Sequence, residues 1–163
     1  MTYDYHGSWE SSTGINAPLY GSGTIYTVDQ STQYWIARIG SNKNKLLLGI
    51  PFYGPSWRLT SGNTGISSPG SPAGHLKYNQ ICQNVRNGWT RVFDNGQQGT
   101  YAFGNNQWVG YDDAQSIQVK INYINNNGLG GGFIWEMSGD DSTGSCGSGT
   151  YPLSTLLKNG LMV

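Results

Sequence analysis

Chemically versatile side chains follow the apolar segments at both ends of this sequence. Tyr3 and Asp4 stand near the end of the first segment, and Trp135 and Glu136 close the last one. In α/β barrels the carboxyl ends of the strands carry the active site, so these residues are candidates for catalysis or substrate binding. The residues alone also allow a simpler interpretation, in which Asp4 caps the following loop and Tyr3 belongs to the wall of a cleft.

Two adjacent aspartates, Asp140 and Asp141, follow shortly after Glu136. Paired carboxylates can serve as the acid and base that flank a glycosidic bond. Adjacent aspartates in a Ser- and Gly-rich loop are more often turn and capping residues, and the sequence favours that structural role here.

The balance of aromatic and charged side chains narrows the class of ligand. The 163 residues are 13% aromatic and 11% charged, with a formal net charge of zero. Nucleic acids and anionic membranes select for clustered positive charge, so neither is expected as a partner. The composition suits an uncharged ligand held by rings and hydrogen bonds, and a neutral sugar is the obvious candidate. The rings at or near the predicted strand ends are Trp9, Tyr53, Trp57 and Trp135.

The two cysteines, Cys82 and Cys146, lie far apart in the sequence. They lack the histidine pair of a zinc site and the CxxC spacing of a redox motif. We therefore expect no metal and no cofactor. Two buried free thiols and one long-range disulfide in an exported protein both stay open on spacing alone.

The N-terminus opens directly on alternating apolar and polar residues that look like a strand. No basic region followed by an apolar run is present, so no signal peptide is expected. No run approaches the ~20 apolar residues of a transmembrane helix. Because natural domains rarely start in mid-strand, this opening predicts a start codon placed there or a piece of a longer protein.

The apolar pattern predicts alternating strands and helices of the α/β class. Two of the strands are continuous apolar runs, as expected for buried parallel strands, and each follows a helical pattern. The longer helix begins with two aspartates at its positive end and stops at a natural Asn-Gly cap. The predicted strands are Met1–Tyr5, Leu46–Phe52 and Gly131–Trp135. The predicted helices are Val28–Ile39, with Val28, Trp35, Ile36 and Ile39 on one side, Asp112–Asn127, and a short Leu153–Leu161.

A different pattern occupies residues 53–110. Pro, Gly, Ser and Asn crowd residues 61–74, and short β-like runs follow at Trp89–Phe93, Thr100–Phe103 and Gln107–Tyr111. Turn signals separate these runs. We expect a small antiparallel insertion between a strand and its next helix, which in a barrel lies on the ligand-binding face.

Four longer motifs together resemble the family 18 glycoside hydrolases, above all animal-type chitinases and their inactive lectin-like relatives. They are MTYDYHGSWE, KLLLGIPFYGPSW, NNQWVGYDDAQSIQVKINYINNNGLGGGFIW and SCGSGTYPLSTLL. The resemblance implies an α/β fold, part of a (β/α)8 TIM barrel, with strands six to eight and an α+β insertion between strands seven and eight. Residues 1–52 would hold strands six and seven, residues 53–110 the insertion, and residues 111–163 the last barrel helix, strand eight and a C-terminal helix.

The resemblance also implies roles for individual residues. Met1, Tyr3 and Asp4 match the M-x-Y-D motif of strand six, whose Tyr and Asp contact the sugar at the cleavage subsite. Trp135 matches the tryptophan that floors this subsite, and Trp9 matches an aromatic on the leaving-group side. Tyr53 lies in the G-x-P-x-Y-G motif at the insertion boundary. Cys82 and Cys146 match a family disulfide, which implies a secreted protein in an oxidising compartment.

Two departures from the family pattern bear on activity. Pro55 stands where many relatives have Arg, which predicts the loss of one polar contact to substrate. The family's proton-donating Glu lies in a D-x-x-D-x-D-x-E motif on strand four, and this chain has no such motif. The resemblance implies retaining, substrate-assisted hydrolysis of β-1,4-linked N-acetylglucosamine polymers. This chain would then bind chitin or chito-oligosaccharides and help to orient the sugar, but it would be inactive alone.

Several alternatives stay open. At 163 residues the chain is shorter than the ~250 of a whole barrel, so we expect strands one to five to be supplied as a separate N-terminal part. A non-catalytic, chitin-binding lectin would use Trp9, Tyr53 and Trp135 to hold sugar without cleaving it. A truncated scaffold with an added Met1 is the third possibility.

Overall fold

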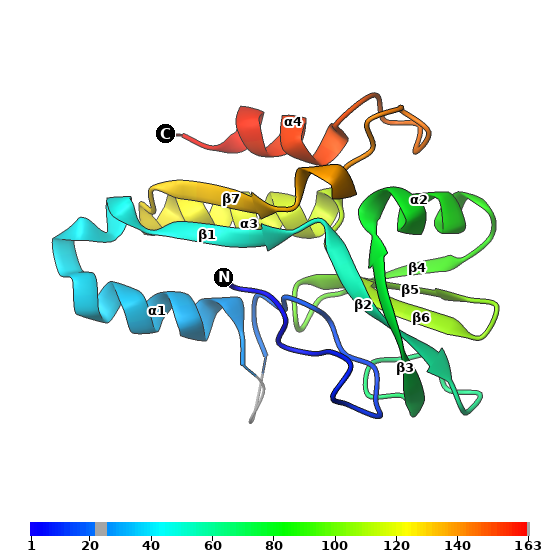
Figure 1. The fold of residues 1–163 in the computed structure, drawn as a ribbon. Helices are drawn as coiled ribbons and strands as arrows, with labels where there is room; N and C mark the ends of the chain where they lie inside the picture. Colours follow the sequence, from blue (N-terminus) through cyan, green and yellow to red (C-terminus); the bar gives the residue numbers. More distant parts are fainter. Residues whose placement is uncertain (22–25, 163) are drawn as a thin grey trace.

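Two sheets of different kinds hold the strands of this chain (Figure 1). The computed structural model describes residues 1–21 and 26–162, and within them β1 (Leu47–Pro51) pairs in parallel with β7 (Gly131–Trp135). The other strands form an antiparallel sheet in the order β3-β2-β6-β5-β4. Their bounds are Tyr53–Leu59 for β2, Gly70–Lys77 for β3, Thr90–Asp94 for β4, Gly99–Gly104 for β5 and Gln107–Tyr111 for β6. The predicted α/β class and the antiparallel strands near residues 89–111 are confirmed.

Helices pack around the parallel pair (Figure 1). The α-helices are α1 (Val28–Ile39), α2 (Tyr78–Arg86), α3 (Ala114–Asn127) and α4 (Pro152–Gly160). Two short 3-10 helices are η1 (Gly40–Lys45) and η2 (Met137–Gly139). α3 packs on β7, and α4 packs on α3. Within the described residues no helix is both long enough and apolar enough to span a membrane.

The sequence of α3 explains both its ends and its packing. Ile117, Ile121 and Ile124 recur at spacings of three and four and are almost completely buried. The Oδ1 atom of Asp113 accepts hydrogen bonds from the first free N–H groups of the helix. The helix ends at Gly128, whose φ of 62° is a left-handed conformation that glycine adopts without strain. The predicted helix over residues 112–127 is therefore confirmed to within two residues.

Helix α1 has the predicted bounds, and its predicted apolar side is only partly buried. Thr27 caps it, because its hydroxyl accepts the Gln30 N–H at 3.1 Å. Val28 and Thr32 are buried, whereas Trp35 is 52% exposed. Trp35 lies two turns beyond Val28 on the same side, where the described residues leave half of its surface open. The predicted apolar side of α1 is therefore formed, but Trp35 is not buried on it.

The first predicted strand, Met1–Tyr5, is not formed among the described residues. Asp4 has a φ of 59°, a left-handed conformation that interrupts extended backbone. The Thr2 hydroxyl donates to the Gly49 carbonyl oxygen at 2.8 Å, and the Tyr5 N–H donates to the Asn16 carbonyl oxygen at 3.1 Å. The segment therefore lies beside β1 through single contacts and not through a ladder of backbone hydrogen bonds.

Strands β2 and β3 and helix α2 lie in a part of the chain whose sequence shows no clear apolar pattern. β3 is an edge strand, mostly exposed, and it contains Gly70, Pro72 and Gly74. An edge strand needs a ladder on only one side and so tolerates these residues, which in isolation indicate a loop. Trp57 of β2 is fully buried against Trp108, so this ring belongs to the core and not to a binding surface.

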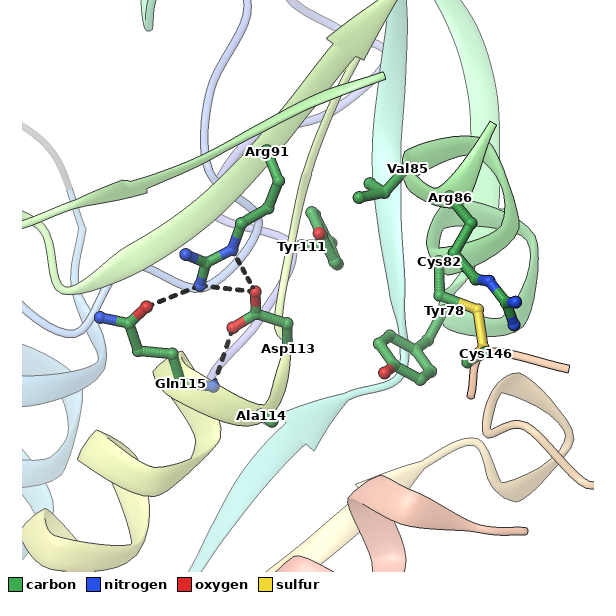
Figure 2. Close-up of a pocket in the computed structure, with 10 residues that line it drawn as sticks. All are labelled: Tyr78, Cys82, Val85, Arg86, Arg91, Tyr111, Asp113, Ala114, Gln115 and Cys146. Atoms are coloured by element: carbon green, nitrogen blue, oxygen red, sulfur yellow. Dashed lines mark hydrogen bonds and ion pairs between the residues drawn. A yellow bond between two sulfur atoms is a disulfide. The ribbon is translucent and has the colours of Figure 1, made fainter. Parts of the chain in front are cut away.

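A disulfide joins Cys82 of α2 to Cys146 in the segment before α4, with the two Cα atoms 5.6 Å apart. Of the two alternatives that the cysteine spacing left open, the long-range disulfide is confirmed. It links α2 to the segment that precedes α4 (Figure 2).

Candidate functional site

The carboxyl ends of β1 and β7 meet at one edge of the parallel pair. Pro51 is paired with Trp135, and the Phe52 N–H donates to the Trp135 carbonyl oxygen at 2.8 Å. The chain then continues into β2 through Tyr53 on one side and into Glu136 on the other. A cavity of about 440 Å³ opens at this edge, and its wall includes Tyr53, Trp135 and Asp4. Three residues that are distant in sequence are thus brought together.

A hydrogen-bond network fixes Asp4 and Tyr53 relative to each other. The Tyr53 hydroxyl donates to Asp4 Oδ1 at 2.5 Å. Asn16 is fully buried behind them; it accepts the Asp4 N–H at 2.9 Å and donates to the Tyr53 carbonyl oxygen at 3.0 Å. Burial raises the pKa of Tyr53, and the hydrogen bond to Asp4 and its charge raise it further. The phenol therefore keeps its proton, and Asp4 stays exposed with a second oxygen that can accept from a ligand.

Tyr3 stands behind this pair and does not line the cavity. Its ring meets those of Tyr53 and Phe133 edge to face, at centroid distances of 6.2 and 6.3 Å. Burial, and then the charge of Asp4, raise the pKa of Tyr3. In this arrangement Tyr3 packs the base of the site and retains a protonated hydroxyl.

A charged network lies beside Tyr53, because Lys77 is its partner on the neighbouring strand β3. Lys77 Nζ lies 3.1 Å from Glu136 Oε1 and donates to the Ser138 hydroxyl at 2.7 Å, and that hydroxyl donates to Glu136 Oε1 at 2.6 Å. The hydrogen bond from Ser138, and then the contact with Lys77, hold the pKa of Glu136 below its ordinary value. A group that donates a proton near neutral pH needs a raised pKa. Glu136 is therefore an acceptor in this wall and is poorly suited as an acid.

Trp135 gives the cavity an apolar surface. Trp135 is 57% exposed and lines the same cavity as Glu136, Asp4 and Tyr53. An exposed ring flanked by donors and acceptors suits a ligand with an apolar face and polar edges. The cavity has the chemistry of a site for a neutral, polyhydroxylated ligand.

Asp140 and Asp141 have the structural role that the sequence favoured. Asp140 accepts hydrogen bonds from the Leu153 and Ser154 N–H groups at the start of α4. Burial would raise the pKa of Asp141, but hydrogen bonds from the Cys146 N–H and from Thr143 outweigh it and lower this pKa to about 2. Both aspartates are 1% exposed. They hold the C-terminal segment and do not line the cavity.

Two predicted binding residues lie outside the cavity. Met1 is 88% exposed and Trp9 is 67% exposed, and neither belongs to the cavity wall. The Trp9 ring lies close over Gly7, where a Cβ atom would be 2.4 Å from it. The predicted sugar contacts of Met1 and Trp9 stay predictions.

Three polar wall residues were missed by sequence reasoning. His75 packs its ring against Tyr53 at 5.5 Å between centroids, and Lys77 and Gln80 line the same wall. His75 and Lys77 lie on β3, which the Gly- and Pro-rich sequence did not reveal as a strand. The G-x-P-x-Y-G motif could have indicated these residues. It places Tyr53 at the site, and a strand that pairs with Tyr53 lies at the same site.

The described residues contain no group of three or more His, Cys, Asp or Glu side chains that could hold a metal ion. The carboxylates of the cavity wall are already paired with neighbouring side chains, Asp4 with Tyr53 and Glu136 with Lys77 and Ser138. We assign no cofactor position to them.

Known proteins are similar to this chain over nearly its whole length. Residues 1–140 match the family model for glycosyl hydrolases family 18. Human chitinase-3-like protein 2 is 39% identical over 181 residues, covering 99% of this chain and 46% of that protein. Human YKL-39, whose structure is described as that of a pseudo-chitinase with retained chitooligosaccharide binding, has a TM-score of 0.90 and 38% identity, with 98% of this chain and 49% of that one covered. The group IV chitinase of Ostrinia furnacalis has a TM-score of 0.92 and 34% identity, with 100% and 49% covered. The chain thus spans about half the length of these relatives.

Proposed function

The chain belongs to the glycosyl hydrolases of family 18, and from this premise we propose that it forms the substrate-binding part of a chitin-degrading barrel. In this proposal residues 1–52 hold strands six and seven, residues 53–110 form the insertion, and residues 111–163 hold strand eight and the flanking helices. The parallel pairing of β1 with β7, the helices packed on it and the antiparallel sheet that follows β1 support the assignment. Met1–Tyr5 would become regular strand six once a neighbouring strand lies on its other side.

The proposed substrate is a β-1,4-linked N-acetylglucosamine polymer, bound across the cavity at the strand ends. The single observation that carries this proposal is the Asp4–Tyr53 hydrogen bond beside the exposed Trp135 ring. The ring offers a platform for the apolar face of a sugar, and the carboxylate offers an acceptor for an acetamido N–H. Trp9 would extend the cleft toward the leaving-group side, and Met1 would bind substrate as part of the M-x-Y-D motif.

The proposed mechanism is retaining and substrate-assisted. The carbonyl oxygen of the N-acetyl group attacks the anomeric carbon while an acid protonates the leaving oxygen, and water then opens the resulting ring. Asp4 would hold the acetamido N–H and so aim the carbonyl oxygen. Tyr3, which lies outside the cavity wall in this chain alone, would contact the same group in the completed barrel, where its protonated hydroxyl can donate. Both residues would orient the N-acetyl group, so that its carbonyl oxygen is held in position to attack the anomeric carbon.

The proton donor would come from outside this chain. Glu136 is the other carboxylate at the cavity besides Asp4, and its lowered pKa makes it a poor acid. We propose that strands one to five, with the D-x-x-D-x-D-x-E motif, complete the site as a partner segment. The disulfide fits a secreted, extracellular protein, since such bonds persist in oxidising compartments.

A complementation experiment tests this function. The chain is refolded with a segment that carries strands one to five of a family 18 chitinase, and the products from N-acetylchitotetraose are followed by ¹H NMR. We expect cleavage that releases the β-anomer first. The same segment with its acid Glu replaced by Gln is the control. A folded complex that binds the tetramer but never cleaves it would contradict the catalytic proposal.

The alternative is a non-catalytic chito-oligosaccharide-binding protein. The similarity to human YKL-39 favours this alternative, because that protein is described as a pseudo-chitinase with retained binding. Binding without cleavage in the complementation experiment, together with loss of binding on Trp135→Ala, would support it.

A further inference from the structure

The segment after the first site residues forms a loop whose two ends are joined. It begins at Asp4 in the wall of the strand-end cavity and ends at the buried Asn16. The side chain of Asn16 accepts the Asp4 N–H at 2.9 Å, and its carbonyl oxygen accepts the Tyr5 N–H at 3.1 Å. Compact surface loops with close ends are frequently functional. We call residues 4–16 the Trp9 loop, because Trp9 lies near its middle and is 67% exposed.

The antiparallel sheet holds the second half of the Trp9 loop. The indole N–H of the fully buried Trp57 in β2 donates to the Glu10 carbonyl oxygen at 3.1 Å. The Thr13 N–H donates to the Ser68 carbonyl oxygen at 3.0 Å. The backbone of Glu10 is therefore fixed to the sheet, and its side chain can serve as an anchor for the residues that precede it.

The Glu10 side chain fastens the turn that carries Trp9. Its two carboxylate oxygens lie 3.1 and 3.0 Å from His6 Nδ1, and one of them also accepts the Gly7 N–H at 3.1 Å. The Glu10 N–H in turn donates to the Gly7 carbonyl oxygen at 3.1 Å. The side chains of His6 and Glu10 are only 15% and 28% exposed, so water competes little for these contacts.

Two glycines allow the rings of this loop to pack directly on its backbone. A Cβ atom at Gly14 would lie 2.2 Å from the ring of His6, and one at Gly7 would lie 2.4 Å from the benzene part of the Trp9 indole. The Trp9 ring therefore rests on the backbone of its own loop. Because Trp9 is nevertheless 67% exposed, the rest of its ring surface is open to solvent.

We propose that His6 and Glu10 are positioning residues that hold the open surface of Trp9 ready to stack on a sugar ring. This inference rests on the proposed function, in which Trp9 contacts the substrate on the leaving-group side. A ring that is fixed before the ligand arrives loses less conformational entropy on binding than a mobile ring. His6 and Glu10 lie outside the wall of the strand-end cavity, and they act through Trp9.

The first test needs no ligand. In the ¹⁵N-labelled chain, the {¹H}–¹⁵N heteronuclear NOE of the Trp9 indole N–H reports how firmly the ring is held, and Trp9→Phe assigns the signal. We expect a value close to that of the strand backbone in the wild type and a clearly lower value in Glu10→Ala. Glu10→Gln keeps an acceptor oxygen and should restore most of the order.

Asp94→Ala is the matched control for this measurement. The Asp94 carboxylate also accepts a backbone N–H three residues away, that of Gln97 at 2.6 Å, in the turn between β4 and β5. Its removal should leave the Trp9 signal unchanged.

The second test is a double-mutant cycle on the affinity of the same chain for N-acetylchitotetraose, followed by amide chemical shifts. Trp9→Ala should weaken binding about 10-fold through lost stacking. Glu10→Ala should weaken it about 3-fold, which is less because the ring is still present. In the Trp9→Ala background, Glu10→Ala should cause no further loss, since a positioning residue acts only through the residue it positions.

Two results would overturn the proposal. One is a Trp9 indole that stays equally ordered in Glu10→Ala, and the other is an equal loss of affinity from Glu10→Ala with and without Trp9. If Glu10→Ala fails to fold, His6→Ala replaces it with the same expectations, because it removes the other partner of the carboxylate.

Failure of the proposed function has a different signature. The amides of residues 4, 53 and 135 would then not respond to the tetrasaccharide, while the order of the Trp9 indole would still depend on Glu10. That result would contradict sugar binding at the strand ends and would support the part of the inference that concerns how Trp9 is held.

Discussion

Carboxylates occupy two contrasting regions of this molecule. Asp112, Asp140 and Asp141 are 1–2% exposed, and donors from their own chain engage them closely. Asp4 and Glu136 are exposed at the cavity, each with one oxygen held by a neighbouring hydroxyl. The difference teaches that a carboxylate after a strand is not in itself a catalytic signal. In a structural carboxylate, donors of the protein already occupy the oxygens. In a binding carboxylate, at least one oxygen is left to accept a hydrogen bond from a ligand.

Breaking the buried ion pair between Lys120 and Asp112 should give the largest loss of stability. Lys120 Nζ lies 2.7 and 2.6 Å from the two oxygens of Asp112, and Lys120 is fully buried. Lys120→Ala leaves Asp112 as an uncompensated buried charge and should lower the free energy of unfolding by about 3–5 kcal/mol. Urea unfolding at neutral pH measures it. The double change Lys120→Met with Asp112→Leu should recover most of the loss, and a fully stable Lys120→Ala would show that the pair is not needed.

Removing the Asp140 carboxylate that caps α4 should cause a smaller loss of stability. Asp140→Ala deletes the acceptor of two N–H groups at the start of α4 and should lower the free energy of unfolding by about 2 kcal/mol. Hydrogen exchange should show faster exchange in α4 than elsewhere. Asp4→Ala, at an exposed carboxylate, is the matched control and should have a smaller effect. Equal effects of the two substitutions would remove the distinction between the regions.

Acid should destabilise the segment that Asp141 holds. The pKa of Asp141 is held at about 2, below its ordinary value of 3.8, so the folded state binds fewer protons than the unfolded state. Its contribution to stability is fully present above pH 3.8 and is lost as the pH falls through about 2. Thermal melting between pH 5 and pH 2 should show this slope in the wild type and a flatter slope in Asp141→Asn. Identical slopes would contradict the assignment.

The exposed pair should affect binding more than stability. Tyr53→Phe removes the donor to Asp4 and frees this carboxylate from its fixed position. We expect the affinity for N-acetylchitotetraose in the assembled barrel to fall about 2- to 10-fold, with little change in melting temperature. Tyr101→Phe, away from the cavity, should change neither. A large loss of stability in Tyr53→Phe would move this pair into the structural group.

Much of the fold followed from local pattern. Ile117, Ile121 and Ile124 identified α3, its Asp and Gly caps set its ends, and continuous apolar runs identified β1 and β7. These signals are local because burial on one face and capping need only residues within a few turns. The capping role of Asp140 and Asp141 was also predictable from their Ser- and Gly-rich surroundings.

The rest depended on tertiary context. β3 is recognisable only through its pairing with β2, because its own residues are mostly exposed. Lys77 was missed in the candidate site for that reason. The alternating residues Met1–Tyr5 do contact β1. They do not form a regular strand, because the left-handed conformation of Asp4 interrupts the continuous backbone hydrogen bonding that a strand needs. Trp35 lies on the apolar side of α1 but is half exposed, because apolar periodicity does not indicate how much of a helix side other elements cover.

The most direct test of the central claim is the affinity of Trp135→Ala for N-acetylchitotetraose in the assembled barrel, measured by isothermal titration calorimetry. Trp135 is 57% exposed at the cavity, so its removal should not unfold the protein. The proposed stacking predicts a loss of about 1–3 kcal/mol in binding free energy at unchanged melting temperature. Unchanged affinity would contradict the claim that sugar binds at the strand ends.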